Sequence, residues 1–97
     1  MNVDFSSLYN HHEREVFNAV VAMAPQYPDI ENNAELMSDV ACVALNRLPP
    51  RYIRHAVDYS FYLTENERME IDAAIAESVS YAFSFVQART ALRAKPR

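Results

Sequence analysis

Residues 44–54 read ALNRLPPRYIR, and this stretch decides where an apolar helix ends and the chain turns. The two consecutive prolines end the helix, because proline has no N–H to donate and pushes the residue before it out of helical geometry. Arg47, Arg51 and Arg54 surround the turn with no acidic residue among them. One turn therefore gathers positive charge, an amide and an aromatic ring.

The bulk composition is that of one soluble globular domain, 1–97. The chain has 97 residues, of which 51% are hydrophobic and 23% are charged. No apolar run approaches the roughly 20 residues of a membrane span, and the N-terminus lacks the basic start and apolar core of a secretion signal. A single cysteine allows no intrachain disulfide. We expect a cytoplasmic protein without a membrane partner.

Charge and glycine content exclude several classes of function. The net charge of −4 argues against broad contact with nucleic acid, which needs a basic footprint. The chain contains no glycine, so it has neither a P-loop nor a dinucleotide fingerprint nor a glycine-flanked nucleophile. Nothing in the sequence pairs a catalytic acid with a base, and we expect no enzyme activity. Cys42 stands alone, so we interpret it as a small residue in or near the core and expect no metal or cofactor.

Capping patterns and prolines place three main helices. A side-chain oxygen at the N-cap followed three residues later by Glu satisfies the first free N–H groups of a helix. This pattern occurs at Asn10…Glu13, Asn32…Glu35 and Thr64…Glu67. The predicted helices cover residues 11–24, 33–48 and 65–93.

Each helix carries an apolar face at helical spacing. On the first, the predicted face consists of Phe17, Val20, Val21 and Ala24. On the second, it consists of Met37, Val40, Ala41, Ala44, Leu45 and Leu48. On the third, it consists of Ile71, Ile75, Val79, Ala82 and Val86, widened by Met69, Tyr81, Phe83 and Phe85. The third face is wider than one small core needs, which favours a partner, most simply a second copy.

Residues 51–63, RYIRHAVDYSFYL, are rich in β-branched and aromatic residues. Such residues favour extended structure, so we predict one or two short strands here. The overall prediction is an α+β fold that is predominantly helical, with a short β segment after the Pro-Pro turn.

The arginine cluster allows two interpretations. In the structural one, Asn46 and Arg47 bond to the last carbonyl groups of the second helix, and Tyr52 packs in the core. In the functional one, the arginines bind phosphate or stack on a base, since a guanidinium is both a rigid fork and a plane. The tyrosine then adds a stacking surface, and the asparagine reads a base edge.

The segment DVACVALNRLPPRYI, residues 39–53, resembles the signature of the late-competence ComFB family. The family pattern is a helix that ends in L-N-x-L-P-P-x-Y and is followed by a strand. The matching positions are Ala44, Leu45, Asn46, Leu48, Pro49, Pro50 and Tyr52. The resemblance covers residues 8–54, about half of the chain, and includes Asn10 and Glu13 at the start of the first helix.

The resemblance implies a small helical domain that forms homodimers. Several family members are receptors for cyclic di-GMP, and in some cases for cyclic di-AMP. Others bind zinc through cysteines, which the lone Cys42 does not support here. After residue 54 this sequence departs from the pattern, with a strand or loop over 55–64 and a long helix over 65–93.

We therefore predict a non-catalytic, homodimeric receptor that binds a cyclic dinucleotide, cyclic di-GMP in preference, and regulates an unidentified protein effector. The predicted ligand-binding residues are Asn46, Arg47, Pro49, Pro50, Arg51, Tyr52 and Arg54. An alternative is a protein-interaction module without a nucleotide ligand, in which the third helix docks a partner. The weakest alternative is DNA binding through the basic tail, RTALRAKPR, whose cations otherwise complement the helix dipole.

Overall fold

The structure, a computed structural model, describes residues 2–55, 57 and 63–94. Its elements in chain order are β1 (Tyr9–Asn10), α1 (His12–Met23), the 3-10 turn η1 (Ala24–Gln26), α2 (Pro28–Glu31), α3 (Ala34–Arg47), β2 (Tyr52–Ile53) and α5 (Glu65–Ala94). The prediction of a predominantly helical α+β fold is confirmed. The three predicted helices correspond to α1, α3 and α5, and every boundary lies within one residue of its prediction.

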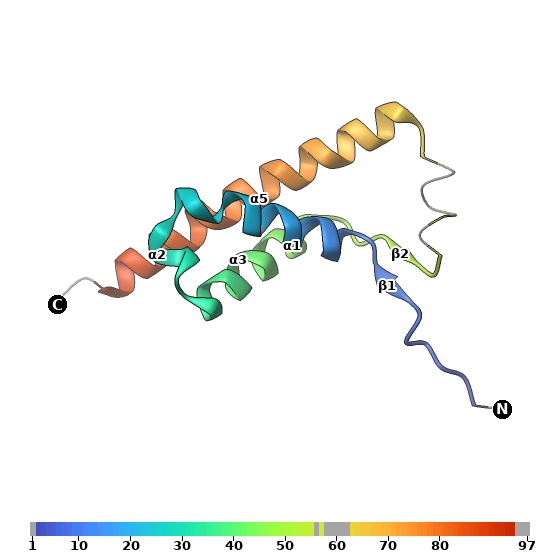
Figure 1. Cartoon of the computed structure of the whole chain (residues 1–97), viewed down its shortest axis with the longest axis horizontal. Coiled ribbons are helices and arrows are strands. Elements are labelled where there is room, and N and C mark those ends of the chain that lie inside the picture. The colour runs from blue at the N-terminus through green and yellow to red at the C-terminus, as the bar shows by residue number, and fades with distance from the viewer. Residues whose placement is uncertain (1, 56, 58–62, 95–97) are drawn as a thin grey trace.

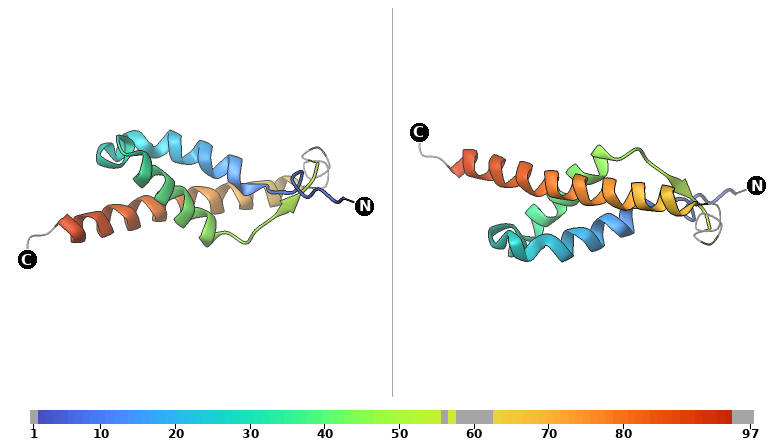
Figure 2. Two further views of the ribbon diagram at one scale, coloured as in Figure 1. Left: turned by 90° about the horizontal axis from the view of Figure 1, so that it is seen from below. Right: turned by 90° about the horizontal axis from the view of Figure 1, so that it is seen from above.

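The long helix α5 is the spine of the molecule, and α1 and α3 pack against its middle and C-terminal parts (Figures 1 and 2). The turn η1 and the short helix α2 connect α1 to α3. Both begin with a proline in their first turn, where a missing N–H costs nothing. None of the described helices is long and apolar enough to cross a membrane.

One core joins α1, α2, α3 and α5. Its buried residues are Val16, Val20, Ala24, Ile30, Val40, Ala44, Leu48, Ile75, Val79, Ala82, Phe83 and Val86. The first turns of α5 project beyond this core: within residues 65–74 every residue is exposed except the half-buried Ile71. The core therefore fixes the middle of α5 and leaves its beginning beside the Pro-Pro turn.

The predicted face of the first helix is confirmed at Val20 and Ala24, which are buried, and is wrong at Phe17 and Val21. Val16 is fully buried, whereas the predicted Phe17 and Val21 are 48% and 66% exposed. Val16 and Val20 are spaced i, i+4, as are Phe17 and Val21, so α1 carries two adjacent apolar stripes. Packing against α3 and α5 buries the first stripe and leaves the second on the surface.

The predicted stripe of the third helix is confirmed, but Phe83 does not widen it outward. Phe83 is fully buried and stacks on Tyr27, with ring centroids 4.6 Å apart and planes 12° from parallel. Tyr27 stands between η1 and α2, so the connection that follows α1 closes over this ring. Tyr81 and Phe85 are partly exposed.

The predicted caps hold in part. The Thr64 hydroxyl accepts a hydrogen bond from the Glu67 N–H at 3.1 Å, as expected. For α3 the cap is Asn33 rather than Asn32, since the Asn33 side chain accepts from the Leu36 N–H at 3.1 Å. Two adjacent asparagines compete for this position, and only Asn33 has the extended backbone of an N-cap.

The sheet consists of two short strands that lie far apart in the sequence. β1 and β2 pair antiparallel, with Tyr9 opposite Ile53 and Asn10 opposite Tyr52. The predicted strand after the prolines is confirmed at Tyr52–Ile53, but its partner β1 was not foreseen. A second strand in the rest of 51–63 would fall largely on residues 56 and 58–62, which lie outside the described residues.

Candidate functional site

The Pro-Pro turn forms a rigid corner between α3 and β2. The Leu48 N–H bonds to the Leu45 carbonyl at 3.3 Å, and Leu48 then adopts an extended backbone, as a residue before proline must. Leu48 is buried and anchors the corner in the core, while Pro49 and Pro50 stay exposed. The prolines end the helix as predicted.

The start of α1 holds this corner from the other side. The Asn10 side-chain oxygen accepts from two backbone N–H groups, that of His12 at 3.2 Å and that of Arg51 at 3.1 Å. The His11 N–H donates to the Arg51 carbonyl at 2.7 Å. Asn10 was predicted as the cap of the first helix, but the N-cap of α1 is His11, which has no side-chain cap hydrogen bond. The Asn10 side chain instead joins the start of α1 to the corner. The backbone at Arg51 is thus fixed before any ligand arrives.

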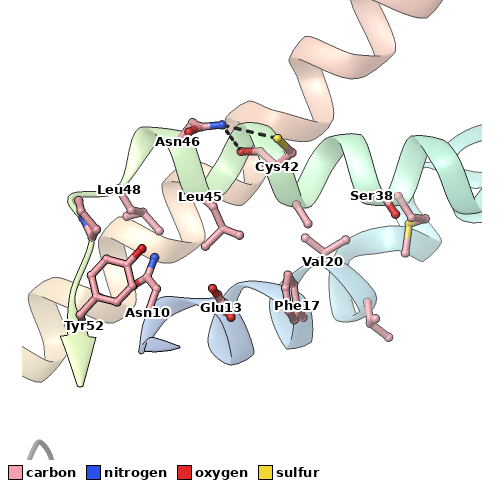
Figure 3. A pocket seen from close by; sticks show the side chains of 14 residues that line it. Asn10, Glu13, Phe17, Val20, Ser38, Cys42, Leu45, Asn46, Leu48 and Tyr52 are labelled. Carbon is pink, nitrogen blue, oxygen red and sulfur yellow. Dashed lines mark hydrogen bonds between the residues drawn. The ribbon is translucent and has the colours of Figure 1, made fainter. Parts of the chain in front are cut away.

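An open groove of about 830 Å³ runs between α1 and α3 and ends at the corner (Figure 3). Its walls are Asn10, Glu13, Phe17, Val20, Val21, Met37, Ser38, Ala41, Cys42, Leu45, Asn46, Leu48, Pro50 and Tyr52. Most of these side chains are apolar, and the second stripe of α1 forms one wall. The volume lies within the range of about 300–1,000 Å³ that is typical of ligand pockets.

Tyr52 lies at the corner end of the groove, beside Asn10 (Figure 3). Its side chain is 69% exposed, so the interpretation that it packs in the core is wrong. The strand pairing with β1 holds its backbone, and the ring is left open to a flat ligand. A solvent-exposed aromatic ring on a fixed backbone loses little conformational entropy on binding.

Asn46 and Cys42 lie on α3 along the same groove. The Asn46 amide donates to the Cys42 carbonyl at 3.0 Å and approaches the Cys42 sulfur at 3.5 Å. The Asn46 amide N–H is therefore already engaged with a backbone carbonyl of α3. Cys42 is exposed, which corrects the interpretation of this residue as one in or near the core.

A second, smaller cavity lies on the other side of the corner, and we call it the corner cleft. It has a volume of about 290 Å³ and is lined by His12, Leu48, Pro49, Pro50, Arg51, Glu70, Ile71 and Ala74. It is therefore bounded by the start of α1, the corner and the projecting part of α5. Leu48 and Pro50 line both the groove and the cleft, so the corner is the partition between them.

His12 is the buried polar side chain of the corner cleft. It is only 6% exposed, and its Nδ1 is buried without a hydrogen-bond partner in the structure. Burial lowers the pKa of His12 below its ordinary value, and the positive charges of His11 and Arg51 lower the pKa further. The Pro49 carbonyl acts in the opposite direction. A neutral imidazole therefore forms part of the wall.

Arg47 points away from both cavities and toward α5. Its guanidinium donates to Glu77 at 3.1 Å and lies 3.8 Å from the centre of the Tyr81 ring. Further along α5, Arg89 lies over Phe85 and donates to Asp39 at 2.8 Å. We call Arg47, Tyr81, Phe85 and Arg89 the arginine–aromatic strip. It joins α3 to α5.

The structure therefore divides the predicted site residues among three places. The groove receives Asn46, Pro50 and Tyr52, and the cleft receives Pro49, Pro50 and Arg51. Arg47 belongs to the strip, and Arg54 is exposed just after β2, outside both cavities. The sequence analysis missed His12 and Glu70. The only signal for His12 was a histidine at the start of the first helix. Nothing in the local sequence placed Glu70 near the corner.

The described residues contain no group of three or more His, Cys, Asp and Glu side chains that could hold a metal ion. Comparison of the chain with known protein families gives one match. The family described as "Late competence development protein ComFB" matches residues 9–90. The chain belongs to the ComFB family. The match extends through most of α5, well beyond the residues 8–54 on which the resemblance was recognised. No curated protein and no solved structure matches the chain.

Proposed function

We propose that this ComFB-family protein is a cytoplasmic, non-catalytic receptor that binds a cyclic dinucleotide, cyclic di-GMP in preference, and passes the signal to a protein effector. The observation that carries the proposal is the exposed Tyr52 ring at the corner end of the groove. The ring sits on a backbone that the pairing with β1 already fixes.

The corner has the chemistry that such a ligand requires. Stacking of one base on an aromatic ring is worth about 1–3 kcal/mol. Arg51 and Arg54 lie one residue before and two residues after Tyr52 in the chain and are exposed, so they place positive charge near the corner, where a phosphate would lie. Asn46 lines the groove and carries an amide oxygen that can accept a hydrogen bond. The chain contains no glycine, so side chains rather than a glycine loop have to hold the phosphates.

Calorimetric titration of the purified protein with cyclic di-GMP, cyclic di-AMP and GTP tests this proposal. We expect micromolar or tighter binding of cyclic di-GMP. Tyr52→Ala is expected to weaken binding about tenfold or more, while Tyr52→Phe keeps the stacking surface and most of the affinity. Tyr81→Ala is the matched control, because this partly exposed tyrosine lies in the strip. Absence of binding by the folded wild type would refute the receptor function.

We further propose that the receptor is a homodimer that uses the end of the groove remote from the corner. Phe17 and Val21 expose an apolar stripe there, and such a stripe is costly in water unless a second copy covers it. Sedimentation analysis should show a dimer that Val21→Lys converts toward monomer. Val57→Lys is the control, since Val57 is equally apolar and exposed but lies outside the groove. A monomeric wild type would contradict this part.

A protein-interaction module without a nucleotide ligand is the second candidate. The exposed apolar stripe of α1 favours it, and α5 adds the exposed apolar side chains of Met69, Tyr81, Phe85 and Leu92. The titration separates the two candidates. A module without a ligand gives no heat with any nucleotide, and Tyr52→Ala then changes nothing.

A further inference from the structure

We infer that the segment before β1, residues 2–8, is an exchange arm that lies in the groove between α1 and α3 of a second copy of the chain. The inference rests on the proposed homodimer and names the part of the second copy that covers the groove. We call this segment the arm. Its residues are all exposed, so none of them packs into the core of its own copy.

The arm carries three apolar side chains that are open to water. Val3, Phe5 and Leu8 are 62%, 69% and 46% exposed. In an extended chain Val3 and Phe5 point to one side and Asp4 points to the other, because side chains alternate. One edge of the arm can therefore be buried against an apolar surface while its charge stays in water, and such burial is favourable.

The groove offers the matching surface. Away from the corner its walls are Phe17 and Val21 of α1 and Met37 and Ala41 of α3. Glu13 is the one charged residue among the described residues that line the groove, and it lies near the corner (Figure 3). The remote end of the groove can therefore take apolar side chains without removing a charge from water.

The arm is long enough for the groove. Between Glu13 and Val21 the helix α1 rises about 12 Å, at about 1.5 Å per residue. Seven extended residues span up to about 23 Å, so the arm can follow this length and still leave a link to β1.

The position of the arm favours a second copy over the copy that carries it. The arm leaves β1 at the corner end of the groove and runs away from α1 (Figures 1 and 2). Its one turn, in which the Leu8 N–H donates to the Phe5 carbonyl at 3.0 Å, does not bring it back toward the remote end. A second copy can present its arm to that end without a reversal of the chain.

Reciprocal exchange buries enough surface for a stable pair. An unfolded segment with the mass of the arm exposes about 1,100 Å². If a groove covers half of this surface, the two contacts of a symmetric pair bury about 2,200 Å² in total, slightly more than the roughly 1,200–2,000 Å² of a standard interface. Each copy gives one arm and receives one, so the exchange is closed at two copies.

The lone cysteine provides a direct test. Cys42 is exposed and lines the groove. In Val3→Cys, oxidation should join the introduced thiol to Cys42 of the second copy, and non-reducing electrophoresis should show a covalent dimer that Cys42→Ser abolishes. Val57→Cys is the matched control, since this exposed valine lies outside the groove. It should give about fivefold less covalent dimer, because a disulfide needs Cα atoms within about 7 Å.

Sedimentation analysis of Phe5→Asp gives a second measurement. A carboxylate is costly in an apolar groove, so we expect the Kd of the dimer to rise about tenfold or more. Ser6→Asp is the control, because it adds the same charge at the next residue, which points to the other side of an extended chain. It should change the Kd by no more than about twofold. Both residues are exposed, so neither substitution disturbs the core.

The outcomes separate the exchange from the homodimer itself. An intramolecular disulfide in Val3→Cys would place the arm in its own groove and overturn the exchange. A covalent dimer no more abundant than in Val57→Cys, or a Phe5→Asp dimer as tight as that of the wild type, would also overturn it, while the homodimer would stand. A monomeric wild type would overturn both. Titration of the same variants with cyclic di-GMP reports on the receptor function separately.

Discussion

The guanidinium of Arg47 lies 3.8 Å from the centre of the Tyr81 ring and donates to the Glu77 carboxylate at 3.1 Å. At the other end of the strip, Arg89 reaches back from α5 to Asp39 on α3. The earlier residue of α3, Asp39, pairs with the later residue of α5, Arg89, and the reverse holds for the other pair. The helices α3 and α5 therefore run antiparallel, and the two ion pairs fix their register. Arg47, the first arginine of the Pro-Pro stretch, thus stabilises the packing of α3 against α5.

Replacement of Arg47 by Ala should lower the free energy of unfolding by about 1–2 kcal/mol. The contact with the ring supplies most of this, since Glu77 is well exposed and a solvated ion pair contributes at most about 1 kcal/mol. Arg47→Lys should recover less than half, because an ammonium group lacks the planar face. Urea unfolding at fixed protein concentration measures the change. The affinity for cyclic di-GMP should not change. A large loss of affinity with unchanged stability would show that Arg47 contacts the ligand after all.

Phe83 and Phe85 should respond very differently to truncation, although both were predicted to widen one face. Phe83 is fully buried against Tyr27, so Phe83→Ala should cost about 3–5 kcal/mol and Phe83→Leu about 1–2 kcal/mol. Phe85 is 43% exposed, so Phe85→Ala should cost about 1 kcal/mol or less. Thermal unfolding measures both. Equal losses at the two positions would show that the packing of α5 differs from that described.

Local signals in the sequence were sufficient to predict the helices and the corner. The cap at Thr64 and the prolines at 49 and 50 act within a few residues, so their consequences can be predicted without the fold. The rotation of α1 could not be predicted, because Val16 and Phe17 begin equally good apolar stripes and only the long-range packing against α3 and α5 chooses between them.

The sequence predicted where in the chain the site lies, but not how its side chains are arranged around the corner. The side of the corner on which each arginine lies depends on α5, which follows it in the chain by more than ten residues and packs by long-range contacts. The pairing of Tyr9 with Ile53 is likewise nonlocal, and strands of two residues carry no periodic signal. Glu70 and His12 meet at the corner for the same reason, which no spacing in the sequence expresses.

Asn33, rather than Asn32, should behave as the cap of α3. Asn33→Ala removes the acceptor for the Leu36 N–H and should cost about 1 kcal/mol. Asn32 donates its side-chain amide to the exposed Pro28 carbonyl, so Asn32→Ala should cost less than about 0.5 kcal/mol. Paired urea unfolding curves of the two variants provide the measurement. A larger loss at Asn32 would place the helix start one residue earlier.

The buried imidazole of His12 should make the fold sensitive to acid. Its pKa in the folded state lies below the ordinary value of 6.5, chiefly because burial disfavours the charged ring. Above pH 6.5 the ring is neutral in both states and adds no pH dependence. As the pH falls through 6.5 the unfolded chain takes up a proton that the folded chain does not, so stability declines until the lowered pKa of the folded state is reached.

This dependence should disappear when the titrating ring is removed. Free energies of unfolding between pH 7.5 and 5.5 should fall with acid in the wild type and fall less in His12→Gln, whatever that variant loses in overall stability. His55→Gln is the matched control, because it makes the same substitution at an exposed histidine. A wild-type slope equal to that of His12→Gln would mean that His12 takes up its proton as easily in the fold as outside it, and that the wall of the cleft is open to solvent.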